Sequence, residues 1–382
     1  MFSELAGIAA AQRGLYPVLP GPELRAAARE AIGVLDLAAA DVRVERTWTD
    51  GGLYGEELSW SVGFGPRTRA YLLKPRDAHG PLPGVVALHC HAGMKYAGKE
   101  KIADGPEEPS PEVRRLRDGI YGGRAFANAL ALRGFVVLAH DVFTWGSRRF
   151  PLETAEGPPG AAQRGDAPGA PLSDAAGNAQ GAPLRDAGGN AQAPLSDADR
   201  YDLLAREHEH VVAKHCAALG TSFTGVVAGE DLAAAAYLRS RPDVGAVGCA
   251  GLSGGGLRAA LLGAFDPDVR AVVVAAMASS YRDMLGGYVE RHTWMLWPPG
   301  LPRLGDYPDL IAARAPEPLM VQYAMRDELF PEAGMLRADA IIAERYRGAP
   351  ESYAAVFAEV PHSFDEPMQE RAFDWLAAHL KV

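Results

Sequence analysis

The chain has 382 residues, 48% of them hydrophobic and 23% charged, with a formal net charge of −10. This apolar fraction can form a sizeable core and excludes global disorder, while the acidic balance argues against nucleic-acid or membrane partners. The three cysteines, Cys90, Cys216 and Cys249, form no Cys-x-x-Cys pair, which excludes a disulfide scaffold and a cysteine-based zinc ribbon. No basic region precedes the first short apolar run, and no apolar run reaches the ~20 residues that cross a bilayer. We therefore expect a soluble, cytoplasmic protein.

The predicted elements begin with a helix over residues 22–36, where apolar positions recur at helical spacing. Two extended segments follow, Val42–Thr47 and Glu57–Lys74, separated by Asp50-Gly51-Gly52, and they predict antiparallel edge strands. From residue 83 onward, short apolar runs alternate with stretches rich in Ala, Leu and Arg. This alternation predicts a mostly parallel central sheet flanked by helices, the α/β class. The predicted strands are Val85–Leu88, Phe135–Ala139, Val244–Ala250, Val269–Ala278, Pro318–Tyr323 and Tyr353–Val360.

We interpret residues 1–382 as a single domain. Residues 1–78 form its N-terminal helix and edge strands. Residues 151–200 contain a loose repeat of about eleven residues, with Ala-Pro-Leu followed by Asp, Gly and Asn. Each copy has only one Leu, too little apolar surface to offset the entropy of ordering, so we expect a mobile insertion; the alternative is a lid or partner-binding segment. Residues 280–310 are unusually aromatic and are expected to form a cap over the functional site.

The sharpest local signal is Gly251-Leu252-Ser253-Gly254-Gly255, which matches Gly-x-Ser-x-Gly between an apolar strand and an Ala/Leu-rich helix. The glycines permit a turn so tight that side chains beside the serine would collide. Such a turn places the Ser253 hydroxyl at the N-terminus of a helix, where developing negative charge is stabilised. Glycine-rich turns can also bind phosphates, but neither Gly-x-Gly-x-x-Gly nor a Walker lysine is present here.

A serine nucleophile needs a histidine base that is oriented by a carboxylate, and in this architecture the chain order is Ser, then acid, then His. Asp327 is the first carboxylate after the strand Pro318–Tyr323, with Glu328 as the fallback acid. His362 follows the last predicted strand. Because catalytic groups collect at the carboxyl ends of parallel strands, these residues predict a Ser253, Asp327 and His362 triad.

The strand Val85–Leu88 ends in His89-Cys90-His91-Ala92-Gly93, the position of an oxyanion-binding loop. One oxyanion donor is then the N–H of Gly254, and the second is that of Ala92 or Gly93. His89 and His91 are interpreted as packing this loop, and His91 is also a candidate for the pocket wall. Trp145, Trp294 and Trp297 are the aromatic candidates for the same wall, with packing in the core as the alternative.

The motif Glu207-His208-Glu209-His210, with His215 nearby, superficially resembles a metal site. A His-Glu-x-x-His motif would need histidine at position 212, where Val212 stands. We therefore interpret this stretch as a solvated or interface face of a helix and expect neither metal nor cofactor.

These motifs together resemble the α/β-hydrolase superfamily, within the dienelactone hydrolase and acetyl xylan esterase-like group. The resemblance covers residues 55–380 without the insertion, and it rests on the His89–Gly93 loop, the Gly251–Gly255 turn, Asp327 and Pro361-His362. It implies a cofactor-free hydrolase of a small ester or lactone, in a group whose members often form oligomers. Dienelactone hydrolases use a cysteine nucleophile, so Ser253 points to the esterase side.

The sequence thus predicts a serine esterase that forms an acyl-enzyme at Ser253. Two alternatives stay open. The same triad serves amide, thioester or C–C cleavage or acyl transfer, and a silent hydrolase fold can act as a binding module.

Overall fold

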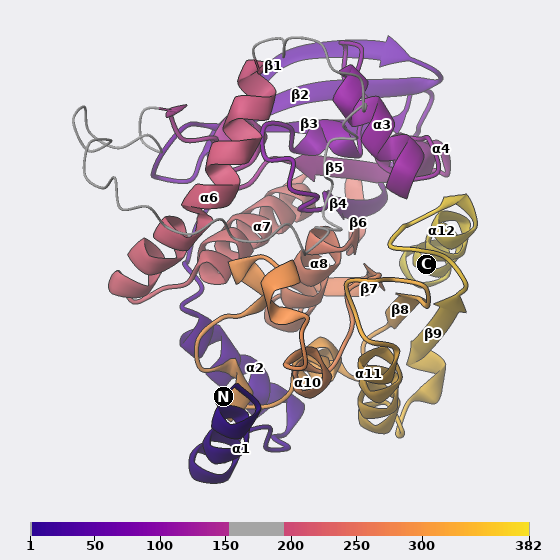
Figure 1. Cartoon of the computed structure of the whole chain (residues 1–382). Coiled ribbons are helices and arrows are strands. Elements are labelled where there is room, and N and C mark those ends of the chain that lie inside the picture. Colours follow the sequence, from indigo (N-terminus) through magenta and orange to yellow (C-terminus); the bar gives the residue numbers. More distant parts are fainter. Residues whose placement is uncertain (1, 153–194, 382) are drawn as a thin grey trace, which may run out of the picture.

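The computed structural model describes residues 2–152 and 195–381. Within these ranges nine strands form one mixed sheet in the order β1-β2-β3-β5-β4-β6-β7-β8-β9 (Figure 1). The strands are β1 (Ala40–Asp50), β2 (Leu53–Ser61), β3 (Thr68–Pro75), β4 (Leu82–Leu88), β5 (Val136–His140), β6 (Val244–Leu252), β7 (Val269–Ala275), β8 (Leu319–Ala324) and β9 (Tyr353–Ala358). The predicted α/β class is confirmed.

The N-terminal strands form the antiparallel part of this sheet. β1, β2 and β3 pair antiparallel with one another, and β3 joins β5 in the same sense. All pairings from β5 through β9 are parallel. The predicted edge strands are confirmed, but the segment Glu57–Lys74 is two strands, because a turn with Gly63 and Gly65 at positive φ divides it.

Helices cover both faces of the sheet. They are α1 (Phe2–Arg13), α2 (Gly21–Ile32), α3 (Pro111–Ile120), α4 (Phe126–Leu132), α6 (Asp197–Ala218), α7 (Phe223–Ser240), α8 (Gly254–Phe265), α9 (Tyr281–Met284), α10 (Tyr307–Ile311), α11 (Glu332–Arg345) and α12 (Glu366–Leu380). α7 and α8 pack on one face and α4 and α12 on the other, as Figure 1 shows. In β4 alternate residues enter the two cores: Val86 and Leu88 enter one, and Val85 and Ala87 the other.

Two stretches of the chain differ from their predicted form. The predicted helix at 22–36 corresponds to α2, whereas α1 was not predicted. Residues 153–194, which hold most of the predicted insertion, lie outside the described residues, and the end of the predicted 151–200 insertion belongs to α6, which begins at Asp197.

The predicted cap over 280–310 contains α9, three short 3₁₀ turns and the start of α10; the turns are η4 (Val289–Arg291), η5 (Trp294–Leu296) and η6 (Leu301–Arg303). η5 packs against α6 and α7, and the hydroxyl of Thr224 on α7 donates a hydrogen bond of 2.7 Å to the carbonyl of Met295. This segment is therefore packed against α6 and α7.

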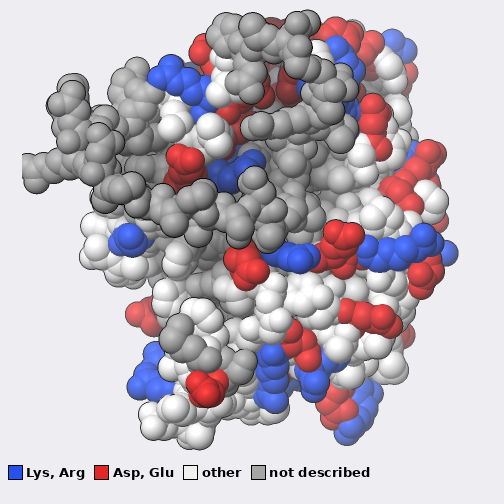
Figure 2. All heavy atoms as spheres, in the orientation of Figure 1, with Lys and Arg blue, Asp and Glu red and all other residues white. Residues whose placement is uncertain are grey.

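The surface carries charges of both signs. On the face drawn in Figure 2, basic and acidic side chains are interspersed and form no large patch of a single charge. Within the described ranges no single helix is long and apolar enough to cross a membrane; α6 and α7 pass that test only when counted together, and they meet at an angle of 82°.

Candidate active site

The turn between β6 and α8 holds Ser253 in a strained conformation. Its φ of 57° and ψ of −123° lie in a region of backbone conformation that residues other than glycine rarely adopt. The Ser253 N–H donates a hydrogen bond of 2.9 Å to the carbonyl of Ala275, which ties the turn to β7. A side chain on Gly251 would collide with the backbone of Gly255, and one on Gly255 would collide with the backbone of Leu88. The predicted glycines are therefore required by close backbone contacts on both sides of the serine.

The change Gly255→Ala is expected to destabilise the protein by about 1–3 kcal/mol, because its Cβ must displace the Leu88 carbonyl under the turn. The control is Gly119→Ala in α3, where an added Cβ meets nothing within 4 Å and is expected to raise stability by up to about 1 kcal/mol. Urea unfolding of both variants measures the difference. Equal stabilities would show that the turn has room for a side chain.

Asp327 and His362 form a hydrogen-bonded pair at the ends of β8 and β9. Nδ1 of His362 lies 2.5 Å from Oδ2 of Asp327, and Oδ1 of Asp327 accepts a bond of 2.8 Å from the N–H of Leu329. The Asp327 side chain is 1% exposed and that of His362 is 19% exposed. Since an ionised carboxylate only accepts, Nδ1 carries the proton and Nε2 is left as a base directed away from Asp327. The fallback acid Glu328 is exposed to solvent.

Strand order relates this pair to Ser253. β6, β7, β8 and β9 are consecutive parallel neighbours, so Ser253, Asp327 and His362 all follow carboxyl ends at one edge of the sheet. Within the described ranges, however, no hydrogen bond joins the Ser253 hydroxyl to His362. Such bonds are often long before a substrate binds and shorten in the reacting complex. The structure thus brings Asp327 and His362 into contact, and among the described residues the Ser253 hydroxyl on the same edge makes no hydrogen bond.

The loop after β4 lies directly against the serine turn. A Cβ on Gly254 would lie 2.8 Å from the backbone nitrogen of His91. The N–H of Gly93 donates a bond of 3.0 Å to Nδ1 of His91, so it is engaged within the loop. The partly buried Ala92 has a φ of 53°, and its N–H donates no hydrogen bond to any residue of the described ranges. Of the two predicted second donors, Ala92 is therefore favoured over Gly93.

A buried carboxylate from α6 joins this loop to the cap. Glu209 Oε2 accepts bonds from Lys95 Nζ at 2.5 Å and from His91 Nε2 at 3.1 Å. Its Oε1 accepts from the hydroxyl of Thr293 at 2.5 Å and from the N–H of Trp294 at 2.8 Å. Burial alone would raise the pKa of Glu209, but the Lys95 charge and the His91 bond outweigh it and hold that pKa well below its usual range. The stretch was predicted to be a solvated or interface face; Glu209 is instead buried within the protein, whereas Glu207 and His210 are exposed.

The three tryptophan candidates occupy different environments. Trp145 is 1% exposed, stacks on Phe223 and meets His91 edge-on with ring centroids 5.2 Å apart. This burial favours the alternative, packing in the core beneath the loop, over a place in the pocket wall. Trp294 is 51% exposed, while Trp297 is partly buried against Tyr281.

His292 belongs to the aromatic stretch that was predicted to form the cap. Its Nε2 donates a bond of 2.8 Å to the carbonyl of Leu329, two residues from Asp327, and its ring lies 4.7 Å from that of Phe330. Burial lowers the pKa of His292 to about 4, and nearby His362, Asp327 and His91 all act on it electrostatically. The cap therefore presents a neutral imidazole beside the Asp327–His362 pair.

Acid is expected to weaken the fold through this imidazole. A histidine whose folded pKa is lowered contributes stability that is complete above its ordinary value near 6.5 and is lost as the pH falls toward about 4. Buried His89, His91 and His140, whose pKa values are also lowered, act in the same direction.

We expect the unfolding free energy of the wild type to fall between pH 6.5 and 4.5, with a contribution of up to about 3 kcal/mol from His292. His292→Gln should show a smaller fall, and His210→Gln, at an exposed position on α6, should match the wild type. Urea unfolding at each pH is the measurement. An unchanged wild-type stability over this range would contradict the assignment of a buried neutral ring.

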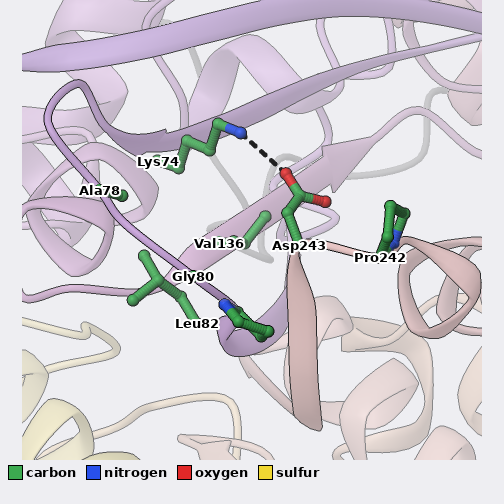
Figure 3. Close-up of a pocket in the computed structure, with 8 residues that line it drawn as sticks. Lys74, Ala78, Gly80, Leu82, Val136, Pro242 and Asp243 are labelled. Carbon is green, nitrogen blue, oxygen red and sulfur yellow. Dashed lines mark hydrogen bonds and ion pairs between the residues drawn. The ribbon is translucent and has the colours of Figure 1, made fainter.

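A pocket of about 280 Å³ lies away from Ser253, Asp327 and His362 (Figure 3). Its lining includes Leu82 and Val136, which begin β4 and β5, and Asp243 just before β6, with Lys74 paired to Asp243 at 2.7 Å. These residues mark the amino ends of the parallel strands, opposite Ser253. Within the described ranges no cluster of His, Cys, Asp and Glu is arranged to hold a metal ion.

The whole fold matches solved esterase structures. A protein of Bacteroides fragilis described as a "putative acetyl xylan esterase" superposes with a TM-score of 0.62 at 14% identity, over 89% of this chain and 74% of that one. A glucuronoyl esterase from Solibacter usitatus gives a TM-score of 0.56 at 14% identity, over 95% of this chain and 94% of that one. The chain has the α/β-hydrolase fold.

Sequence comparison gives a weaker link. No family model matches the chain. The "Putative hydrolase YtaP" of Bacillus subtilis is 21% identical over 306 residues, covering 79% of this chain and 80% of that protein. At these identities the structural likeness establishes the fold, and the reaction has to be argued from the site.

Proposed function

We propose that this α/β-hydrolase-fold protein is a serine carboxylic-ester hydrolase. The observation that carries the proposal is the 2.5 Å bond between Asp327 and His362, on the same sheet edge as the strained Ser253. A buried carboxylate holding Nδ1 of a partly exposed imidazole leaves Nε2 as the base that a serine nucleophile requires.

In the proposed reaction Oγ of Ser253 attacks the ester carbonyl carbon while Nε2 of His362 takes its proton. The N–H groups of Gly254 and Ala92 stabilise the oxyanion of the tetrahedral intermediate. The intermediate expels the alcohol, which leaves with the proton from His362. Water then attacks the acyl-enzyme, giving up a proton to His362, and the acid is released as Ser253 recovers its hydrogen.

We further propose an ester of a carbohydrate or sugar acid as the substrate class. The solved structures of similar fold include one described as a "putative acetyl xylan esterase" and one described as a glucuronoyl esterase. The exposed ring of Trp294 provides a flat apolar surface suited to a sugar face, and neutral His292 provides a hydrogen-bonding nitrogen.

The test combines a mechanism probe with a substrate panel. A fluorophosphonate should label the peptide that contains Ser253, and the protein should hydrolyse p-nitrophenyl acetate, acetylated xylose oligomers or methyl glucuronate. A kcat/KM higher for a sugar ester than for p-nitrophenyl acetate supports the substrate class. Absence of both labelling and ester turnover would refute the proposed function.

A further inference from the structure

Lys101, in the 3₁₀ turn η1 (Lys99–Lys101), is a buried cation that the proposed mechanism does not use. Its side chain is inaccessible to solvent. Nζ donates to three backbone carbonyls of the loop after β4: Cys90 at 2.6 Å, Met94 at 3.0 Å and His91 at 3.3 Å. Within the described ranges it has no carboxylate at ion-pair distance. Because unpaired buried charge is costly, these carbonyls take the place of a counter-ion and of water.

The direction of each carbonyl also determines the direction of the N–H in the same peptide group. The peptide that joins His91 to Ala92 is trans, so its N–H lies antiparallel to its C=O. Since the His91 carbonyl faces Lys101, the Ala92 N–H points away from Lys101. Among the described residues this N–H has no hydrogen-bond partner, and it follows directly on His91, whose backbone nitrogen lies against Gly254. The next N–H, of Gly93, donates to the His91 ring instead.

We propose that Lys101 is a positioning residue, which orients and polarises the Ala92 N–H as an oxyanion donor. The inference rests on the proposed ester hydrolysis. A hydrogen bond from a cation to the carbonyl of an amide draws electrons toward the oxygen and makes the N–H of that amide a stronger donor. In a buried site of low dielectric this polarisation is screened little.

Lys99, two residues earlier, provides the contrast. It is also buried, but its Nζ contacts the carboxylates of Glu100 at 2.5 Å and Asp141 at 3.1 Å. Its charge is therefore neutralised locally, and among the described residues its ammonium donates no hydrogen bond to the carbonyls of the loop. Both lysines are thus buried, but the ammonium of Lys99 binds carboxylates and that of Lys101 binds backbone carbonyls.

The charge on Lys101 is expected to change at mildly alkaline pH. Burial lowers the pKa of Lys101 to about 8, with the loop residue Cys90 opposing this shift. The other charged groups that act on it are Asp202 of α6, Arg258 of α8 and Asp141 after β5. A neutral amine polarises the loop less, so kcat should decline as the pH rises through this range.

The experiment compares Lys101→Met with the matched control Lys99→Met, both checked for folding by circular dichroism and thermal unfolding. We expect Lys101→Met to lower kcat by about 10- to 100-fold with KM changed by less than about threefold. Its affinity for a trifluoromethyl ketone, which forms the tetrahedral adduct, should fall in parallel. Lys99→Met, at a temperature where it is folded, should keep kcat within about threefold.

A folded Lys101→Met protein with wild-type kcat, or with a loss that appears only in KM, would overturn the inference and leave the proposed esterase intact. A wild type inactive on every ester would overturn both. If Lys101→Met does not fold, the wild-type profile decides: a decline in kcat centred near pH 8 supports the inference, and a flat kcat from pH 7 to 9.5 refutes it.

Discussion

Replacing Ser253 with alanine is expected to lower kcat for ester hydrolysis by about 10⁴- to 10⁶-fold. In the proposed mechanism the side-chain oxygen is the only atom of Ser253 that bonds to the acyl group, whereas the Gly254 and Ala92 N–H groups that would stabilise the oxyanion belong to the backbone. These donors and the substrate contacts survive the change, so a small residual rate and a nearly unchanged KM are expected. Burst-phase kinetics with p-nitrophenyl acetate should lose the rapid release of one equivalent of nitrophenol.

A matched control separates loss of the nucleophile from general damage. Ser279, in the loop after the neighbouring strand β7, is fully buried and its hydroxyl has no partner within the described ranges. Ser279→Ala should keep kcat within about twofold and leave stability unchanged or slightly higher, since an unsatisfied hydroxyl is removed. Full turnover by the Ser253→Ala protein would instead require another nucleophile.

The sheet and the serine turn were predictable because local backbone rules determine them. Continuous apolar runs mark strands buried on both faces, and only glycine permits the close contacts around Ser253. Asp327 and His362 were predictable from their position just past two strand ends, and the bond between them confirms that these two side chains meet. Their catalytic role stays a prediction, as does that of Ser253.

Contacts between distant segments were not predictable in the same way. Glu209 meets Lys95 and Thr293, residues 114 and 84 positions away, and no local pattern links them. One signal existed: Tyr201, Ala205 and Glu209 recur every fourth residue and form the buried face of α6. A carboxylate within an otherwise apolar stripe of a helix needs a buried partner, so this spacing marks Glu209 as a paired side chain.

Replacing Asp327 with asparagine is expected to lower kcat by about 10⁴-fold while leaving the fold intact. In the wild type, one oxygen of the Asp327 carboxylate accepts a hydrogen bond of 2.5 Å from Nδ1 of His362. The other oxygen accepts a hydrogen bond of 2.8 Å from the N–H of Leu329. An asparagine can keep the bond to Leu329 with its oxygen, and its NH₂ group then faces Nδ1. The histidine is forced into the tautomer with its proton on Nε2, which cannot accept a proton from Ser253.

The adjacent carboxylate provides the discriminating control for this prediction. Glu328 directly follows Asp327 and is only one residue farther from the end of β8, yet its side chain is exposed. Glu328→Gln should therefore keep kcat within about twofold. Single-turnover rates of both variants, with circular dichroism as the check on folding, give the comparison. If Glu328→Gln lost activity and Asp327→Asn did not, the orienting acid would be Glu328 and the loop after β8 would have to rearrange when substrate binds. If neither change mattered, the bond to His362 would be structural, and a carboxylate-oriented histidine could no longer be the basis for assigning Ser253 as the nucleophile.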